Sequence, residues 1–137
     1  MRALFDTNVL LAAFLTDGVC TKLLTRARKR HFDLIICPFI LLEFERILIK
    51  KFAATKAEKE NALVLIAEAA RESVQPSEPP SGVCRDKDDD NVLACALEAK
   101  AEYLVTGDKD LLVVDLQFGI HIVSPRKFWE IITGKGT

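Results

Sequence analysis

Apolar residues follow two alternating patterns along this chain: short runs typical of buried strands, and stretches with the i, i+3, i+4 spacing of helices. The short runs predict five strands, at residues 2–5, 33–37, 73–75, 103–106 and 120–123. The helical stretches predict helices over residues 8–15, about 19–30, 38–52, 56–72, 89–100 and from Pro125 onward. Because strands alternate with helices, the pattern predicts an α/β fold with a parallel sheet and helices on both of its faces.

Local signals mark several of the predicted boundaries. Thr55 and Glu58 have the spacing of a capping box, and Ser124 with Pro125 is typical of the start of a last helix. Residues 16–18 offer capping chemistry for the second helix. Residues 76–82 contain three prolines and a glycine, which predict a loop.

The length and composition restrict the class of protein. A chain of 137 residues fits one domain, 1–137, that buries roughly two thirds of its unfolded surface. No run approaches the roughly 18 apolar residues of a membrane span, and the first residues lack the apolar core of a secretory signal. We therefore expect a soluble, cytoplasmic protein without a membrane partner. Its four cysteines show no CxxC spacing, so we expect reduced and mostly buried thiols.

The net charge of −1 argues against a protein that holds nucleic acid chiefly through a basic surface, but not against a nucleic-acid substrate. Positive charge is concentrated in the second predicted helix, at Lys22, Arg26, Arg28, Lys29 and Arg30. Two interpretations stay open for this helix. Its arginines either contact phosphates or form a solvated face.

Carboxylates stand at the ends of two predicted strands. Asp6 directly follows the first strand, and Asp108 follows the fourth after one glycine. The carboxyl ends of parallel strands share one edge of the sheet, where open α/β sheets bind ligands. Together with Glu43 and the acids of residues 86–90, they predict a site for a hard cation such as Mg²⁺, which suits phosphodiester hydrolysis. Helix capping is the alternative role for each aspartate, and Asp110 is interpreted as a solvated charge at a helix start.

The helical acids are harder to assign. Glu43 and Glu45 flank the apolar stripe of the third predicted helix on opposite sides, so periodicity does not choose between them. Asp89 and Asp90 both lie within a turn of Leu93, and a solvated run is the alternative. The acids of residues 88–90 are nevertheless more than helix capping requires.

The order and spacing of these segments resemble the PIN-domain ribonucleases. The segments are Asp-Thr-Asn-Val-Leu at residues 6–10, an acid in the helix after the second strand, Asp-Asn-Val-Leu-Ala at 90–94, and Thr-Gly-Asp at 106–108. The ending Ser-Pro-Arg-Lys-Phe at 124–128 resembles the branch described as toxins of toxin-antitoxin systems, relatives of the VapC toxins. The resemblance spans nearly the whole chain.

The resemblance implies a three-layer α/β/α sandwich with a five-stranded parallel sheet and four acids at its carboxyl edge. These are Asp6, Glu43, Asp90 and Asp108. Asp6 and Asp90 would be the firmest metal ligands, Glu43 would bind or position the metal, and Asp108 would complete the pocket directly or through water. The family also implies Mg²⁺ or Mn²⁺ as cofactor, single-stranded RNA as substrate, a homodimer, and a cognate antitoxin as partner.

Three other interpretations compete with a PIN nuclease. A phosphoacceptor receiver domain needs an aspartate after its third strand, where only Glu78 is available. A haloacid-dehalogenase-type phosphatase needs a second aspartate where Asn8 stands. The strongest competitor is a catalytically silent PIN scaffold that binds RNA or a protein partner, although the presence of all four acids weighs against it.

Overall fold

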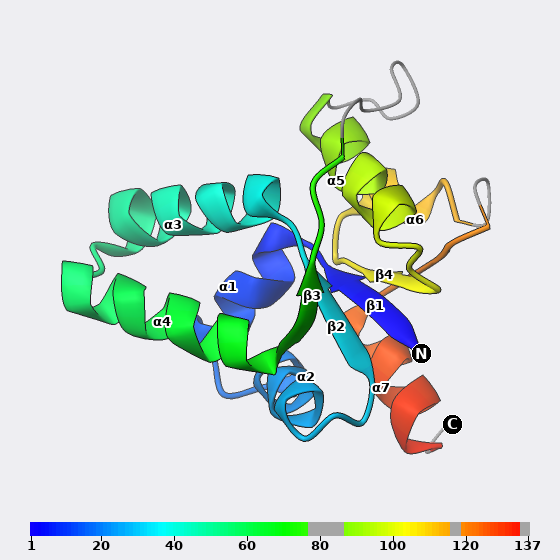
Figure 1. Cartoon of the computed structure of the whole chain (residues 1–137), viewed down its shortest axis with the longest axis horizontal. Coiled ribbons are helices and arrows are strands. Elements are labelled where there is room, and N and C mark those ends of the chain that lie inside the picture. Colours follow the sequence, from blue (N-terminus) through cyan, green and yellow to red (C-terminus); the bar gives the residue numbers. More distant parts are fainter. Residues whose placement is uncertain (77–86, 116–118, 135–137) are drawn as a thin grey trace.

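A five-stranded parallel sheet forms the centre of the molecule (Figure 1). The computed structural model describes residues 1–76, 87–115 and 119–134. Its strands are β1 (Arg2–Phe5), β2 (Asp33–Ile36), β3 (Ala70–Ser73), β4 (Tyr103–Val105) and β5 (His121–Val123). They lie in the order β3-β2-β1-β4-β5, and every neighbouring pair is parallel. The predicted α/β fold with a five-stranded parallel sheet is confirmed.

Helices cover both faces of this sheet. Within the described ranges they are α1 (Thr7–Leu15), α2 (Val19–Arg28), α3 (Pro38–Phe52), α4 (Lys56–Ala69), α5 (Lys87–Glu98), α6 (Lys109–Leu112) and α7 (Pro125–Thr133). Helices α1 and α2 lie on one face, where α7 packs on α2, and α5 with α6 lies on the other. No single helix of these ranges is long and apolar enough to cross a membrane, and α1 with α2 meets that test only as a pair bent by 99°.

Most predicted helix boundaries agree with the structure. The capping box is present, since Thr55 N donates to Glu58 Oε1 at 2.9 Å and Glu58 N to Thr55 Oγ1 at 3.1 Å. Ser124 accepts a hydrogen bond from the third residue of α7. The predicted side-chain cap of α2 is wrong: Gly18 is the N-cap residue and makes no side-chain bond. The nearby hydroxyl of Thr16 instead donates to a carbonyl oxygen at the end of α1.

The third strand begins earlier than its sequence suggests. We expected a helix to residue 72 and a strand at 73–75, whereas α4 ends at Ala69 and β3 spans Ala70–Ser73. This strand lies at the edge of the sheet, is mostly exposed, and pairs with β2 through a shifted register. An exposed edge strand lacks the continuous apolar run that identifies buried parallel strands. Of the predicted loop at 76–82, residues 77–82 lie outside the described residues.

An aromatic cluster fixes the last helix to the sheet. The ring of Phe128 lies 5.0 Å from that of Phe32, 5.4 Å from that of Tyr103 and 6.2 Å from that of Phe5, measured between centroids. Phe128 is fully buried. Such pairs add a geometric preference to the burial of large apolar surfaces.

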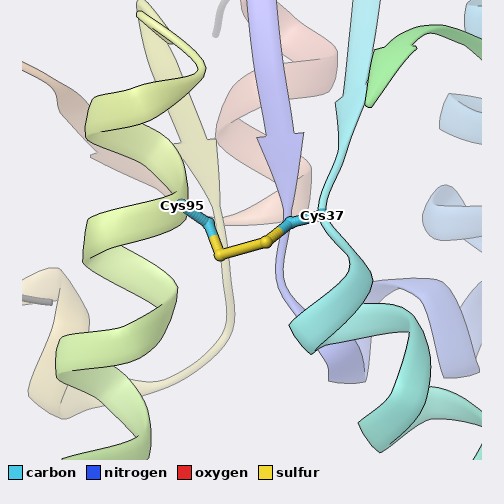
Figure 2. Close-up of a disulfide and its surroundings, with 2 residues drawn as sticks. All are labelled: Cys37 and Cys95. Carbon is cyan, nitrogen blue, oxygen red and sulfur yellow. A yellow bond between two sulfur atoms is a disulfide. The ribbon is translucent and has the colours of Figure 1, made fainter. Parts of the chain in front are cut away.

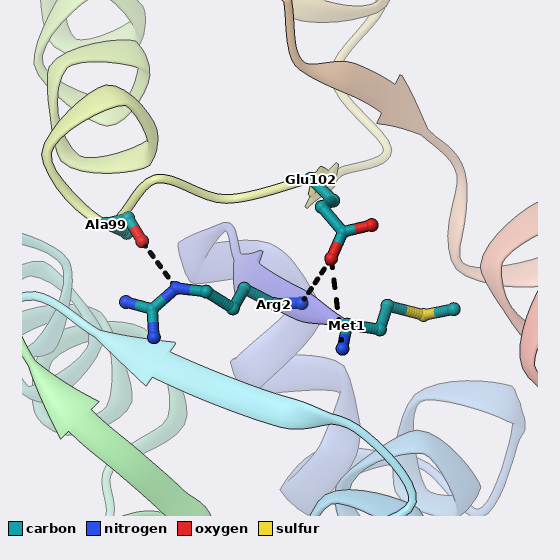
Figure 3. A network of polar contacts seen from close by, with 4 residues as sticks. All are labelled: Met1, Arg2, Ala99 and Glu102. Carbon is teal, nitrogen blue, oxygen red and sulfur yellow. Dashed lines mark hydrogen bonds and ion pairs between the residues drawn. The ribbon is translucent and has the colours of Figure 1, made fainter.

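Polar contacts close the amino-terminal edge of the sheet (Figure 3). Arg2 Nε donates to the Ala99 carbonyl at 2.9 Å, and Arg2 N donates to Glu102 Oε1 at 3.3 Å. The amino group of Met1 lies 3.8 Å from the same Glu102 oxygen. Arg2 also pairs with Glu72 of β3 at 3.1 Å. These contacts tie the start of β1 to β3 and to the segment between α5 and β4.

The arginines of α2 and the turn after it make contacts within the chain. Arg26 lies over the ring of Trp129 at 4.9 Å, and Arg28 lies 3.6 Å from a carboxylate oxygen of Glu68. Arg30 donates to two carbonyl oxygens at the end of α4, at 2.8 and 3.1 Å. These side chains link α2 to α4 and α7. Phosphate binding by the arginines of this helix stays a prediction.

Two cysteines form a disulfide, so the expectation of reduced thiols is wrong for them. Cys37 follows β2 and Cys95 lies in α5, with Cα atoms 6.2 Å apart (Figure 2). Their 58-residue separation leaves no local spacing signal, and only the packing of α5 brings them together. Cys20 is a buried thiol, as expected, and burial raises its pKa. Cys84 lies outside the described residues.

Candidate metal centre

Asp6 lies where β1 ends and α1 begins. Its backbone N–H donates to the Val105 carbonyl at 3.0 Å, which joins it to the end of the neighbouring strand β4. Its Oδ1 accepts a hydrogen bond from Thr7 N at 2.7 Å, so it caps α1. The side chain is nevertheless buried, with only 6% of the residue exposed. Asp6 thus combines the capping role with a place at the carboxyl edge of the sheet.

Thr106 connects the ends of the two strands. Its buried hydroxyl donates to Asp6 Oδ2 at 2.7 Å and accepts from Asp108 N at 3.0 Å. The Asp6 carboxylate is therefore held at both oxygens, by Thr7 N and by Thr106. This arrangement fixes the orientation of Asp6 and the position of Asp108 together.

Glu43 points toward this site from α3. The hydroxyl of Thr7 donates to Glu43 Oε1, and Arg46 Nη2 lies 3.8 Å from Glu43 Oε2. Glu45, the alternative left open by periodicity, instead pairs with Lys59 of α4 at 3.7 Å. The packing of α3 between α1 and α4 thus distinguishes the two glutamates.

A second group of acids lies at the starts of α5 and α6. Carboxylate oxygens of Asp89, Asp108 and Asp110 lie within 4.8 Å of one another. Asp108 caps α6 by accepting from Asp110 N at 2.8 Å, and this cap brings Asp110 into the group. Asp90 is buried in the same turn as Asp89, with 4% and 7% of the residues exposed. The selection of Asp90 as the third metal ligand stays a prediction.

Sequence reasoning did not select Asp89 and Asp110 as site residues. Asp110 was interpreted as a solvated charge, but it is half-buried beside Asp108. The signal was the Asp-x-Asp spacing, because an aspartate that caps a helix accepts from the N–H two residues later. For Asp89, the signal was the uninterrupted acidic run, which exceeds what capping needs.

The electrostatics of Asp6 connect the two groups of acids. Burial raises the pKa of Asp6 above its usual value, and the hydrogen bonds from Thr106 and Thr7 oppose this shift. The negative charges of Glu43 and Asp108 raise the pKa further. Asp108 therefore belongs to both groups: it repels Asp6 on one side and lies beside Asp89 and Asp110 on the other.

These side chains fit a hard divalent cation. The site offers carboxylate oxygens, which Mg²⁺ and Mn²⁺ prefer as ligands. Two oxygens bound to one Mg²⁺ at about 2.1 Å lie at most about 4.2 Å apart, close to the 4.8 Å limit within which the oxygens of Asp89, Asp108 and Asp110 gather.

Residues 2–110, more than half of the chain, match the PIN domain family. The chain belongs to this family. PIN domains are generally nucleases that use divalent metals, so membership supports a nuclease whose acidic cluster can hold a metal. No curated protein matches the chain.

The matched part of this PIN domain contains every acid described above. It includes β1 to β4 and the start of α6, whereas β5 and α7 lie beyond it. The elements that carry the candidate metal ligands therefore all lie within the family match.

Proposed function

We propose that this PIN domain is a Mg²⁺- or Mn²⁺-dependent endoribonuclease that cleaves single-stranded RNA. The observation that carries the proposal is the continuous run of carboxylates from Glu43 through Asp6 and Asp108 to Asp89 and Asp110. Capping of α1 and α6 accounts for the places of Asp6 and Asp108 at this edge of the sheet, but it does not account for Glu43, which lies within α3. Burial of like charges is unfavourable without a cation, so the presence of these buried carboxylates supports a functional role.

Each side chain has a role in this proposal. Asp6, Glu43, Asp90 and Asp108 are the proposed metal ligands, with Asp89 and Asp110 as additional acids beside Asp108. The hydroxyl of Thr106 holds Asp6 by donating to Asp6 Oδ2, and the hydroxyl of Thr7 holds Glu43 by donating to Glu43 Oε1. A bound divalent cation would polarise a phosphoryl oxygen and lower the pKa of water.

The same carboxylates make the cation necessary for substrate binding. An RNA phosphate carries negative charge and would be repelled by a site of several carboxylates. A divalent cation bound by them would neutralise part of this charge and offer the phosphate a positive contact. Metal removal should therefore weaken both RNA binding at the site and chemistry.

Cleavage of an unstructured RNA oligonucleotide tests the proposal. The purified protein should cleave it in Mg²⁺ or Mn²⁺ and stop on addition of EDTA, because the acids supply no electrophile of their own. The same sequence within a stable hairpin should be cleaved more slowly, and gel analysis of end-labelled RNA measures both rates. Cleavage that continues in excess EDTA would contradict the proposal.

The second candidate is a silent PIN scaffold that binds RNA or a protein without cleaving it. Metal binding without hydrolysis of any single-stranded RNA tested would favour this candidate. The number of acids gathered at the site weighs against it, since a scaffold gains nothing from their repulsion.

We further propose that the enzyme is the toxin of a toxin-antitoxin pair and forms a homodimer. Support comes from the resemblance of residues 124–128 to that branch and from an apolar cavity of about 390 Å³ between α1 and α3. Leu15 and Phe52 line this cavity and are 42% and 51% exposed. Exposed apolar surface of this kind marks sites of protein association. Light scattering of the purified chain tests the homodimer.

Co-purification tests the antitoxin. The product of a neighbouring small reading frame should co-purify with the enzyme and inhibit cleavage, and Phe52→Glu should abolish both effects by placing a charge in the apolar cavity. Leu42→Glu is the matched control, because Leu42 is 66% exposed on the same helix and does not line the cavity. Absence of such a reading frame, or equal binding by both variants, would favour a stand-alone nuclease.

A further inference from the structure

The disulfide joins two elements that carry candidate metal ligands. Cys37 is the N-cap residue of α3, six positions before Glu43, and Cys95 lies in α5, five positions after Asp90. Five helical residues span about 7.5 Å along the axis. Figure 2 shows the bond crossing from α5 to the junction of β2 and α3. The crosslink is therefore close to the metal centre without being part of it.

The surroundings of the two sulfur atoms give an external thiol a route for thiol–disulfide exchange. Both cysteines are almost fully buried, yet both line a cavity of about 160 Å³. Asn91 of α5 lines the same cavity, together with Gln75 and Pro76 after β3. A small thiol can reach the sulfurs from this cavity, and burial should make the reaction slow.

We propose that the Cys37–Cys95 disulfide is a redox-sensitive tether that holds the starts of α3 and α5 at the spacing the metal centre needs. Disulfides are rare in reducing compartments, where those that form are usually transient and either catalytic or redox-sensing. The tether fixes the relative position of Glu43 on one helix and Asp89 and Asp90 on the other. The inference rests on the proposed function, since it concerns the affinity of the same site.

A dithiol reductant can supply the two electrons for reduction. One of its thiolates attacks the Sγ atom of one cysteine, breaks the Sγ–Sγ bond and releases the other cysteine as a thiolate. Its second thiol then attacks the resulting mixed disulfide and releases the first cysteine. The protein gains two electrons and two protons, and the dithiol becomes a disulfide.

Loss of the tether should loosen both the fold and the site. Breaking a disulfide that closes a long loop should lower the melting temperature by about 5 to 15 °C. Misplacement of groups that orient metal ligands typically lowers metal affinity about 10-fold or more. We expect a loss of Mn²⁺ affinity of about this size on reduction.

The experiment compares three forms of the full chain in a Cys20→Ala/Cys84→Ser background, in which only this pair of cysteines remains. The forms are the oxidised protein, the protein reduced with dithiothreitol, and a Cys37→Ser/Cys95→Ala variant. Peptide mapping identifies the crosslink, calorimetry measures the Mn²⁺ affinity, and circular dichroism measures the melting temperature. The Cys20→Ala single variant is the matched control, because it removes a buried thiol outside the tether.

The expected result is tight Mn²⁺ binding by the oxidised form and weaker binding by the other two. Equal, measurable affinities in the oxidised and reduced forms would overturn the tether and leave the proposed function intact. The same holds if mapping finds no crosslink after oxidation. Absence of Mn²⁺ binding in every form would instead overturn the proposed function. If the double variant does not fold, the comparison of the oxidised and reduced protein still tests the tether.

Discussion

Replacing Asp6 by asparagine is expected to lower the rate of RNA cleavage at least about 100-fold, because metal binding and charge stabilisation are lost together. Asparagine has nearly the same size and is an equally good N-cap residue, so α1 should remain intact. Single-turnover cleavage of an unstructured RNA in Mn²⁺ measures the loss, and circular dichroism verifies the fold.

Two control substitutions distinguish the loss of a carboxylate at the site from the loss of a carboxylate elsewhere in the protein. Asp17→Asn removes an exposed carboxylate before α2 and should leave the rate unchanged. On α3, Glu43→Gln should lower the rate, whereas Glu45→Gln should not, since Glu45 pairs with Lys59 away from the site. Equal cleavage by wild type and Asp6→Asn would identify a contaminating nuclease and remove the basis for the assignment.

The metal-free protein is expected to lose stability as pH rises from about 4 toward neutrality, relative to Asp6→Asn. Burial and the charges of Glu43 and Asp108 raise the pKa of Asp6 from its ordinary value of 3.8 in the folded state. Well below pH 3.8 the carboxyl is protonated in both states. Between the unfolded and folded pKa values the folded state binds more protons, so the free energy of unfolding falls with pH, and the loss is complete above the folded pKa.

Metal should reverse this loss. At a free metal concentration of 100 times Kd, Mn²⁺ should stabilise the wild-type protein by about 2.7 kcal/mol. Asp6→Asn should melt higher than wild type without metal at pH 7 and respond less to Mn²⁺, because one change removes a repelling charge and a ligand. Melting curves from pH 4 to 7, with and without Mn²⁺, measure both effects. A lower melting temperature for metal-free Asp6→Asn would mean that Asp6 acts mainly as a charged helix cap.

The sequence predicts those parts of the fold in which burial leaves a recognisable pattern of apolar residues. Strands β1 and β4 are short apolar runs ended by polar residues, so their ends and the positions of Asp6 and Asp108 could be predicted. The predicted position of the edge strand β3 is wrong because its exposed residues form no apolar run.

The remaining features depend on contacts between distant segments. The choice between Glu43 and Glu45 depends on Lys59, which lies on another helix. The grouping of Asp89 with Asp108 depends on how α5 packs beside α6, and the disulfide depends on how α5 lies over the sheet. Periodicity within one segment contains no information about such contacts.

The aromatic cluster around Phe128 shows where the folding unit ends. The family match stops at residue 110, but Phe128 lies beyond it and covers Phe5, Phe32 and Tyr103 within the matched region. A fragment truncated after Asp110 would retain every candidate metal ligand while exposing these three rings to water. The boundary of the family match is therefore not a safe boundary for expressing this nuclease domain.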